Sequence, residues 1–240
     1  MLWEEINWAE FGKLVPEKYD TVILPAGTIE AHGVLPLGTD DLIPVEIARR
    51  IAGDLKAIVA PAVNYGITST LLGYPGSLTV SGEIFESYVR EILISMGNWD
   101  FDKIVVMNGH GGQIEQLGRA ARDAWRACRK KIVVIQWWQC CDDIVEGIYG
   151  RGGGHAATDE NAAIQAFRPD LVREDLYSDD MVYNQPKGFL TFPNAGTILA
   201  YKENAGYIDF SQGKAEQYFS MVVERIKGHL LEIFRRWERI

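Results

Sequence analysis

Four short apolar runs, rich in β-branched residues, constrain the fold of this chain more than any other feature. They are TVILPA (21–26), AIVAPAV (57–63), KIVVMN (103–108) and KIVVIQWW (131–138). Continuous apolar runs of this length are typical of strands buried on both faces of a parallel sheet. The segments between and after them have helical patterns, at 40–55, 81–100, 111–130 and 211–240. This alternation predicts an α/β fold with a mainly parallel sheet and helices on both faces.

The spacing of apolar residues predicts which face of each helix is buried. In 81–100, Ser81 suits the N-cap position. The helical spacing there runs through Ile84, Tyr88, Glu91/Ile92 and Ser95/Met96. In 111–130 the expected buried stripe consists of Ile114, Leu117, Ala121, Ala124 and Cys128.

Composition limits the class of protein. No linker or repeat divides the 240 residues, so we expect a single domain over 1–240. The net charge of −9 argues against a nucleic-acid partner, because phosphate binding needs a basic surface. The acidic start MLWEEINWAE lacks the layout of a signal peptide, and no apolar run approaches the roughly 18 residues of a membrane span. Three cysteines, two of them adjacent, fit free structural thiols in a reducing cytoplasm.

Three of the four histidines lie in glycine-rich bends. His32 lies in EAHGVLP, His110 in MNGHGGQ and His155 in GGGHAAT, whereas His229 lies in the last predicted helix and is expected at the surface. The first two bends directly follow an apolar strand, at the edge of the sheet where α/β proteins bind ligands. Imidazole and carboxylate together are the usual donors for Zn²⁺, Fe²⁺ or Mn²⁺. Glu30 and His32 are two residues apart in an extended segment, so both can face the same site.

Asp40 and Asp41 follow at the start of the next predicted helix. Aspartate is favoured as a helix cap, and we interpret Asp41 in that way. For Asp40 two roles stay open, a helix cap and a carboxylate that bridges two metal ions. At the same edge, Trp137 and Trp138 end the fourth strand. By alternation one of them points toward the site, where it can stack on a planar substrate, and the other packs in the core; we assign the substrate contact to Trp138.

Four motifs, in order along the chain, resemble the creatininase family of metal-dependent amidohydrolases. They are GTIEAHGVLPLGTD (27–40), YPGSLT (74–79), NGHGG (108–112) and GGHAATDEN (153–161), and the resemblance covers the chain from about Thr21 onward. It implies a three-layer α/β/α sandwich, a dinuclear metal site at the strand ends and a homo-hexamer. The family includes creatininase, formamide deformylases and a peptidase of redox-cofactor maturation.

The resemblance also implies roles for single residues. Glu30 and His110 resemble ligands of one metal, His32 resembles a ligand of the second metal, and Asp40 resembles the bridging carboxylate. His155 matches a family histidine beside the substrate, and Ser77 matches a position that helps to hold it.

This chain departs from the family pattern at two places. The segment EAHGVLP is one residue shorter than the frequent E-x-H-G-x-H-L-P and lacks its second histidine, and the preserved LPLGTD aligns the bridging position with Asp40. Creatininase has a tyrosine and then a metal-binding glutamate after the NGH histidine, where this chain has Gly111 and Gly112. Creatinine is therefore not the expected substrate, and another carboxylate must complete the second metal site. Glu160 is the first candidate for this ligand, and Asp159 is the second. Two other roles suit these carboxylates equally well: stabilising the first turn of a helix, or forming a hydrogen bond to a metal ligand.

The resemblance, together with these residues, implies a metal-dependent amidohydrolase that acts on a small amide, cyclic amide or formamide. Two divalent ions would lower the pKa of a water molecule, and His155 or the nearby Glu160 would move a proton to the departing nitrogen. The segments 64–80 and 176–210 are expected to shape the pocket. Two alternatives stay open: a nucleotide or sugar-phosphate binder that uses NGHGG as a phosphate loop, and a catalytically inactive relative that serves as a binding subunit. About two bound metal ions per chain would favour the hydrolase, and no bound metal would favour either alternative.

Overall fold

The central sheet has four parallel strands. The computed structural model describes residues 1–239. The strands are β1 (Thr21–Ala26), β2 (Ala57–Val59), β3 (Lys103–Asn108) and β4 (Lys131–Gln136), in the order β2-β1-β3-β4. The last residues of β1, β3 and β4 are aligned across the sheet, with Ala26 opposite Asn108 and Asn108 opposite Gln136. The carboxyl ends of the three long strands therefore meet at one edge.

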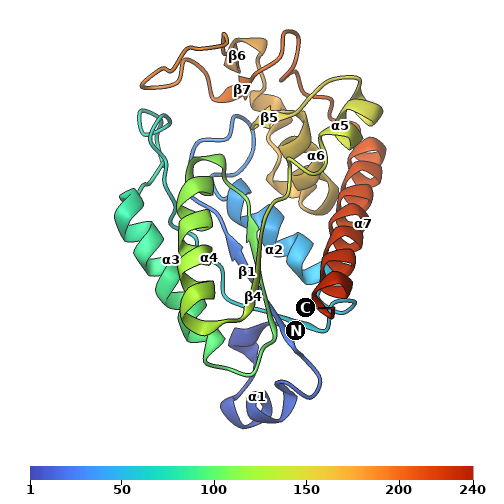
Figure 1. Cartoon of the computed structure of the whole chain (residues 1–240). Coiled ribbons are helices and arrows are strands. Elements are labelled where there is room, and N and C mark those ends of the chain that lie inside the picture. Colours follow the sequence, from blue (N-terminus) through green and yellow to red (C-terminus); the bar gives the residue numbers. More distant parts are fainter. Residues whose placement is uncertain (240) are drawn as a thin grey trace.

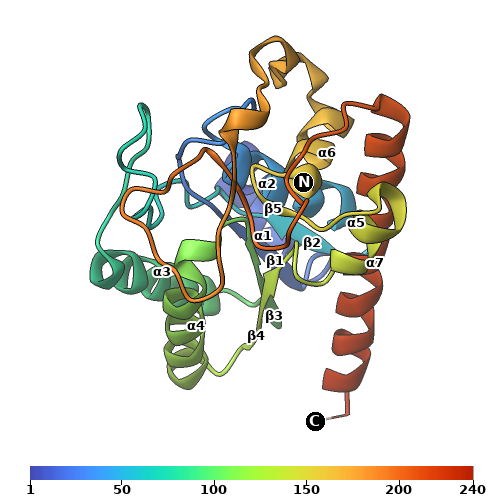
Figure 2. The same cartoon turned by 90° about the horizontal axis from the view of Figure 1, so that it is seen from above.

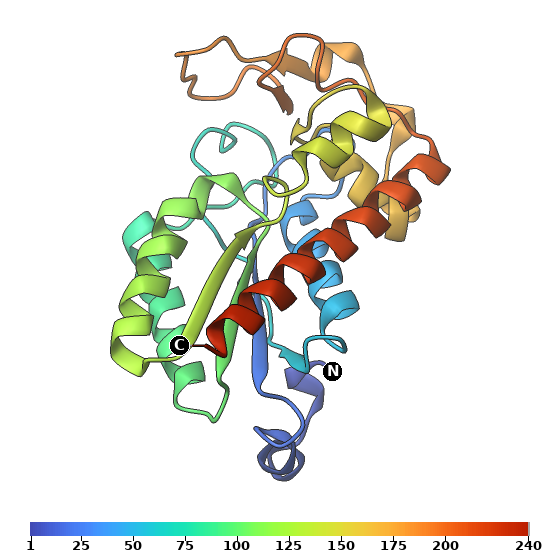
Figure 3. The ribbon, with the colours of Figure 1, turned by 45° about the vertical axis from the view of Figure 1, so that its right-hand side comes forward.

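Helices cover both faces of this sheet, as predicted. On one side lie α3 (Gly82–Gly97) and α4 (Ile114–Cys128); on the other lie α2 (Thr39–Ile51), α6 (Thr158–Phe167) and α7 (Gln212–Trp237) (Figures 1 and 3). Strand residues alternate between the two sides: Val22 and Leu24 pack in the α3/α4 core, and Ile23 packs in the α2/α7 core. The expected three-layer α/β/α sandwich is confirmed. Both main cores flank the same sheet, and a single domain over 1–240 stays a prediction.

Smaller elements lie beyond the ends of the sheet. Helix α1 (Trp8–Leu14) lies below the amino ends of the strands, and α5 (Asp142–Tyr149) follows β4 (Figure 1). A second sheet lies above the carboxyl ends, with the order β5-β7-β6, made of β5 (Gly154–His155), β6 (Val182–Asn184) and β7 (Ile198–Ala200). Short 3₁₀ helices complete the described elements, at Trp3–Glu5, Gly111–Gln113, Pro169–Leu171, Glu174–Leu176 and Asp179–Met181. Within residues 1–239, no helix combines the length and the apolar character needed to cross a membrane.

The predicted buried face of α3 is wrong over its first turns and right at Met96. Ile84 and Tyr88 are 63% and 57% exposed, whereas Met96 is buried together with the neighbouring stripe of Phe85, Val89 and Leu93. Both stripes have helical spacing and lie side by side on the helix, so periodicity alone does not choose between them. The predicted cap is confirmed, because the Ser81 hydroxyl accepts a hydrogen bond from the N–H of Ile84.

Candidate metal centre

The candidate site lies in a cavity of about 620 Å³ at the carboxyl edge of the sheet. Glu30 and His32 lie on the segment after β1, His110 follows β3, and Asp40 lies in the first turn of α2, two residues after the N-cap Gly38. Seen from above, the segment between β6 and β7 passes over this edge (Figure 2). The expected pocket segments do line the cavity, from Ile67 to Leu71 and from Gln185 to Lys202.

Each of the three histidines binds a backbone carbonyl through one ring nitrogen. The pairs are His32 Nδ1 with Glu30 O (3.0 Å), His110 Nε2 with Ile67 O (2.8 Å) and His155 Nε2 with Ala31 O (2.7 Å). A carbonyl oxygen only accepts, so these nitrogens donate, and the second nitrogen of a neutral ring carries its lone pair into the cavity. This arrangement is typical of metal-binding histidines, whose outer nitrogen is fixed by a backbone group.

Asp40 lies between two of these inward nitrogens. Its Oδ1 is 3.0 Å from His32 Nε2, and its Oδ2 is 2.9 Å from His110 Nδ1. Glu30 Oε1 is 3.3 Å from His110 Nδ1, and Glu160 Oε2 is 3.6 Å from His32 Nε2. Each side of Asp40 therefore has one imidazole and one further carboxylate, which is the layout of a carboxylate shared by two sites.

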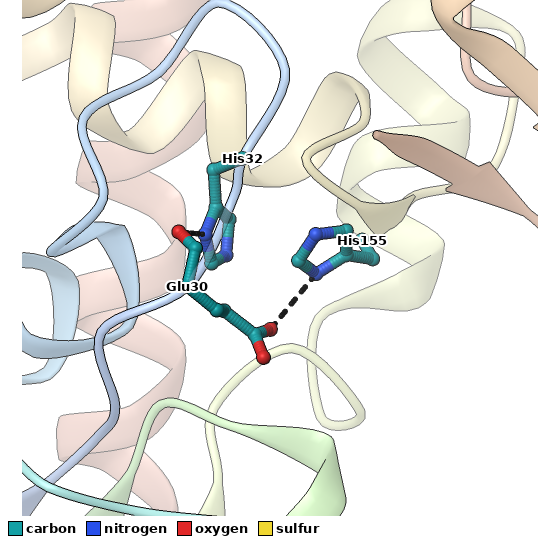
Figure 4. A group of neighbouring side chains, drawn as sticks. All are labelled: Glu30, His32 and His155. Atoms are coloured by element: carbon teal, nitrogen blue, oxygen red, sulfur yellow. Dashed lines mark hydrogen bonds and ion pairs between the residues drawn. The ribbon is translucent and has the colours of Figure 1, made fainter. Parts of the chain in front are cut away.

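Three groups of side chains could each hold an ion, since their ligand atoms lie within 4.8 Å of one another. Two share Asp40: Glu30 with Asp40 and His110, and His32 with Asp40 and Glu160. The third consists of Glu30, His32 and His155 (Figure 4). In it, the His155 ring turns Nδ1 toward Glu30 Oε1 at 3.3 Å.

The donor atoms fit a cation. With neutral histidines, Glu30 Oε1 and Asp40 Oδ2 are buried and have no hydrogen-bond donor among residues 1–239. They lie close to imidazole lone pairs, an arrangement of acceptors that needs a metal ion or a proton between them. In the metal-free chain protons supply that charge: burial lowers the pKa of each histidine, but the adjacent Asp40 and Glu30 outweigh it and raise the pKa of His32 to about 10 and of His110 to about 9.

His155 differs from the other two histidines. Burial and the neighbouring positive charge of His32 lower the pKa of His155 to about 3. Its imidazole is therefore neutral near pH 7, with Nδ1 free to accept a proton or a metal bond.

The structure explains why a side chain is absent at Gly112. A Cβ at this position would lie 2.5 Å from His110 Nε2 and 2.6 Å from Ile67 O. Glu160 reaches the same region from the first turn of α6, where it also accepts a hydrogen bond from the N–H of Ala156 (2.6 Å). Asp159 instead accepts from the N–H of Gly154 (3.0 Å) and belongs to none of the three ligand groups. Of the two candidate carboxylates, Glu160 is the one that faces His32 and Asp40.

The two predicted substrate contacts differ in their surroundings. Trp138 lines the cavity and Trp137 is fully buried, which is the division of roles that the sequence predicted. The expected strand of 131–138 is too long, however: β4 ends at Gln136 and both tryptophans lie in the turn after it, so strand alternation does not place them. The Ser77 hydroxyl accepts a hydrogen bond from the N–H of Ala31 (3.0 Å), and Ser77 is not among the described residues that line the cavity. The structure thus gives Ser77 a contact with the segment that carries Glu30 and His32; its contact with a substrate stays a prediction.

Two residues that the sequence did not single out hold the candidate ligands in place. Thr68 donates a hydrogen bond from Oγ1 to Glu30 Oε2 (2.6 Å), which leaves Oε1 directed at the histidines. Asn108 accepts from the N–H of His110 (3.1 Å) and donates to its carbonyl (2.7 Å). Asn108 could have been found from its place in NGHGG, whereas no local signal marks Thr68.

Comparison with known proteins identifies the family. The family model named Creatininase, for creatinine amidohydrolase, matches residues 4–227. This chain belongs to the creatininase family. It is 27% identical to the creatinine amidohydrolase of Pseudomonas putida over 208 residues, which cover 79% of this chain and 77% of that one.

Other relatives have different activities. A mycofactocin precursor peptide peptidase of Mycobacterium ulcerans is 27% identical over 68% of this chain and 65% of its own length. A 3-dehydro-scyllo-inosose hydrolase of Thermotoga maritima is 26% identical over 75% of this chain and 60% of its own length. The family is therefore one of hydrolases whose substrates differ.

Solved creatininase structures share the fold. A tryptophan-to-phenylalanine mutant creatininase superposes with a TM-score of 0.85 and 23% identity, covering 97% of this chain and 98% of that one. A mutant creatininase described as Zn-Zn type superposes with a TM-score of 0.84, again at 23% identity and over 97% and 98% of the two chains. A further match is described as creatininase Mn, with a TM-score of 0.83 and 22% identity over the same shares.

Proposed function

We propose that this creatininase-family hydrolase is a dinuclear metal-dependent amidohydrolase that cleaves a C–N bond of a small amide, cyclic amide or formamide. The observation that carries the proposal is Asp40, whose two oxygens face His32 and His110 separately. Glu30 and His110 would hold one divalent ion, His32 and Glu160 the other, and Asp40 would bridge them. Zinc, iron and manganese all suit this donor set.

The chain's own groups have distinct tasks in this reaction. When bound, two divalent ions supply a water of lowered pKa and polarise a carbonyl oxygen. His155, neutral and aimed into the cavity, accepts a proton there and returns it to the departing nitrogen; Glu160 is the alternative carrier. Trp138 offers a planar face against which an amide or a ring can stack.

The charges of the cavity argue against the phosphate-binding alternative. Among the described lining residues, Lys202 is the only lysine or arginine, and its ammonium is paired with Glu146. Asp142 lines the same region and has no cationic partner among the described residues. A phosphate or carboxylate on the substrate would meet this acidic wall, so a neutral or cationic substrate is favoured.

Creatinine is not the expected substrate. The second metal site draws its carboxylate from α6 and not from position 112, which leaves Gly111 and Gly112 as bare backbone beside the metals. A Cβ placed at position 111 would have only Trp138 nearby, at 3.9 Å, whereas the space at position 112 is taken by His110 and the carbonyl of Ile67. The tyrosine and the glutamate that the resemblance places here in creatininase are therefore both missing from this wall.

Metal analysis and a substrate panel test the proposal. We expect about two divalent ions per chain after purification with metal, and turnover of at least one cyclic amide, formamide or small urea. The kcat/KM for creatinine should lie well below about 10⁴ M⁻¹s⁻¹, the lower end of the range for ordinary enzymes. A chain without bound metal that binds nucleotides or sugar phosphates would favour the binding-protein alternative. A chain that binds neither metal nor these ligands and turns over nothing in the panel would favour the inactive relative.

A further inference from the structure

We propose that Asp159 is a positioning residue for His155, holding the segment that carries this imidazole against the first turn of α6. His155 lies on β5, between Gly154 and Ala156. Gly154 donates its N–H to Asp159 Oδ1 (3.0 Å), and Ala156 donates its N–H to Glu160 Oε2 (2.6 Å). Two consecutive carboxylates of one helix turn thus fix the residues on either side of the histidine.

The surroundings of Asp159 show a carboxylate that acts on the backbone. It is 4% exposed, and the amides of Asp159 and Glu160 at the start of α6 lie against it together with that of Gly154. Its oxygens belong to none of the ligand groups around Asp40. Asp159 lines the same cavity as the candidate ligands, and its hydrogen bond joins the start of α6 to the His155 segment.

The segment itself has a shape that depends on this contact. A Cβ at Gly153 would overlap the Asp159 carboxylate, so only glycine fits there without displacing it. Ala156 has a φ of 54°, in the left-handed region that residues with a Cβ rarely adopt. Backbone of this kind persists only where its surroundings fix it, and here the fixing groups are Asp159, Glu160 and the bond from His155 Nε2 to Ala31 O.

Loss of the contact should move His155 and spare the metal ligands. Glu30, His32, Asp40 and His110 lie on other elements, and Glu160, the fifth candidate ligand, keeps its place in α6 and its own hydrogen bond from the N–H of Ala156. The effect should extend to β7 as well, since His155 pairs with Leu199 and Gly154 with Ala200. The expected result is an imidazole out of place beside an intact metal site.

Kinetics of Asp159→Ala and Asp159→Asn in the metal-loaded enzyme test this role, which rests on the proposed function. Asp159→Ala should lower kcat by roughly 10- to 100-fold, as loss of a group that orients a catalytic residue does, with KM and metal content nearly unchanged. Asp159→Asn keeps an oxygen for the N–H of Gly154 and should restore part of the rate. Asp143→Asn, an exposed first-turn aspartate of α5 paired with Arg225, is the matched control and should leave kcat unchanged.

A double-mutant cycle with Gly153→Ala gives the sharpest result. Alone, the added Cβ overlaps the Asp159 carboxylate and should lower kcat as Asp159→Ala does. Combined with Asp159→Ala it has space, so the loss in the double variant should be far smaller than the product of the two single losses. If the loss of kcat in the double variant equals the product of the two single losses, the proposal is overturned. It is also overturned if Asp159→Ala loses as much metal as a variant of a metal ligand.

A measurement without turnover separates this proposal from the proposed function. In the metal-free protein, Asp159→Ala should speed hydrogen exchange at the Gly154 amide and shift the NMR signals of the His155 ring, while those of His32 and His110 stay in place. If these signals are the same as in the unaltered protein, Asp159 does not position His155. That conclusion holds whether or not any amide is hydrolysed.

Discussion

Asp40 and Asp41 are neighbours in the first turn of α2, yet their side chains meet different groups. Burial by itself would raise the pKa of Asp40, and the His32 and His110 imidazoles instead hold it well below its usual range. Asp41 has no imidazole within salt-bridge distance, and burial beside Asp40 raises its pKa to about 8. Asp40→Ala should therefore remove most of the bound metal, and Asp41→Ala much less. Equal metal content in the two variants, by elemental analysis, would show that the bridging residue is misassigned.

His110 and His155 should respond differently to the same substitution. His110 faces Asp40 and Glu30 at 2.9 and 3.3 Å, so His110→Ala should lose metal and activity together. His155 contacts Glu30 alone among the described carboxylates, at 3.3 Å, and lies on a two-residue strand outside the central sheet. His155→Ala should keep most of its metal and lose roughly 10²–10⁴-fold in turnover, the usual contribution of a general acid–base. The check is metal content beside turnover; metal loss in both variants would make His155 a ligand.

Metal binding should release protons, and this gives a pH dependence of known sign. The raised pKa values of His32 and His110, about 10 and about 9, mean that the metal-free site is protonated near pH 7. In the metal-free chain these protonated histidines stabilise the fold at low pH, and that stability is lost as the pH rises through about 9 to 10. Metal binding needs the neutral rings, so the rise in Tm caused by metal should grow with pH. A rise in Tm that is constant or falls between pH 6 and 9 would contradict this protonation state.

At the scale of elements, the strands were predictable and the cover over the site was not. The continuous apolar runs at β1 and β3 match the observed strands residue by residue. The second run predicted a longer strand than β2, which ends at Val59 before Pro61. Strands β5, β6 and β7 have two or three residues each, too few for any periodicity, and segments distant in sequence bring them together. The hydrogen bond from Thr68 to Glu30 likewise joins residues distant in sequence, so no local pattern predicted it.

The cover formed by the segment between β6 and β7 is held down by Asn194. Its N–H donates to Thr70 O (2.8 Å), its Nδ2 donates to Thr70 Oγ1 (2.8 Å), and its carbonyl accepts from the Tyr74 hydroxyl (2.8 Å). Asn194→Ala removes only the two side-chain bonds, the one to Thr70 Oγ1 and one that Oδ1 accepts from Thr191 Oγ1 (3.2 Å), each worth about 0.5–1.5 kcal/mol. We expect KM to rise about 2- to 10-fold with a smaller change in kcat, because the metal site is untouched. Steady-state kinetics measure KM and kcat of this variant. Gln185→Ala is the comparison, because Gln185 lines the cavity from the same segment and lies outside this anchor. A fall in kcat without a change in KM would show that the anchor does not control substrate access.

At the scale of the whole molecule, net charge and strand–helix order predicted the class and the layers, because both depend on the sum of many residues. Which face of α3 is exposed depends instead on how that one helix is rotated about its axis, and a sum over many residues does not determine this rotation. The stripe that periodicity assigned to the core of α3 contains Ile84 and Tyr88, which lie one turn apart on its exposed face. An exposed apolar face on an otherwise acidic protein is a feature of surfaces that contact another chain.

This face leads to a test of the expected homo-hexamer. Ile84 and Tyr88 on α3, with the half-exposed Trp99 just beyond it, offer the aromatic and aliphatic contacts that interfaces are rich in. In light scattering at micromolar concentration we expect a mass of six chains of 26.9 kDa each. The double variant with Ile84→Glu and Tyr88→Glu should reduce that mass, since two buried charges would face the partner without counter-ions. Met221→Glu, at an exposed apolar residue of α7, should leave the mass unchanged. A monomer mass for the unaltered chain would refute the hexamer, and an unaltered mass for the double variant would refute the role of α3 in it.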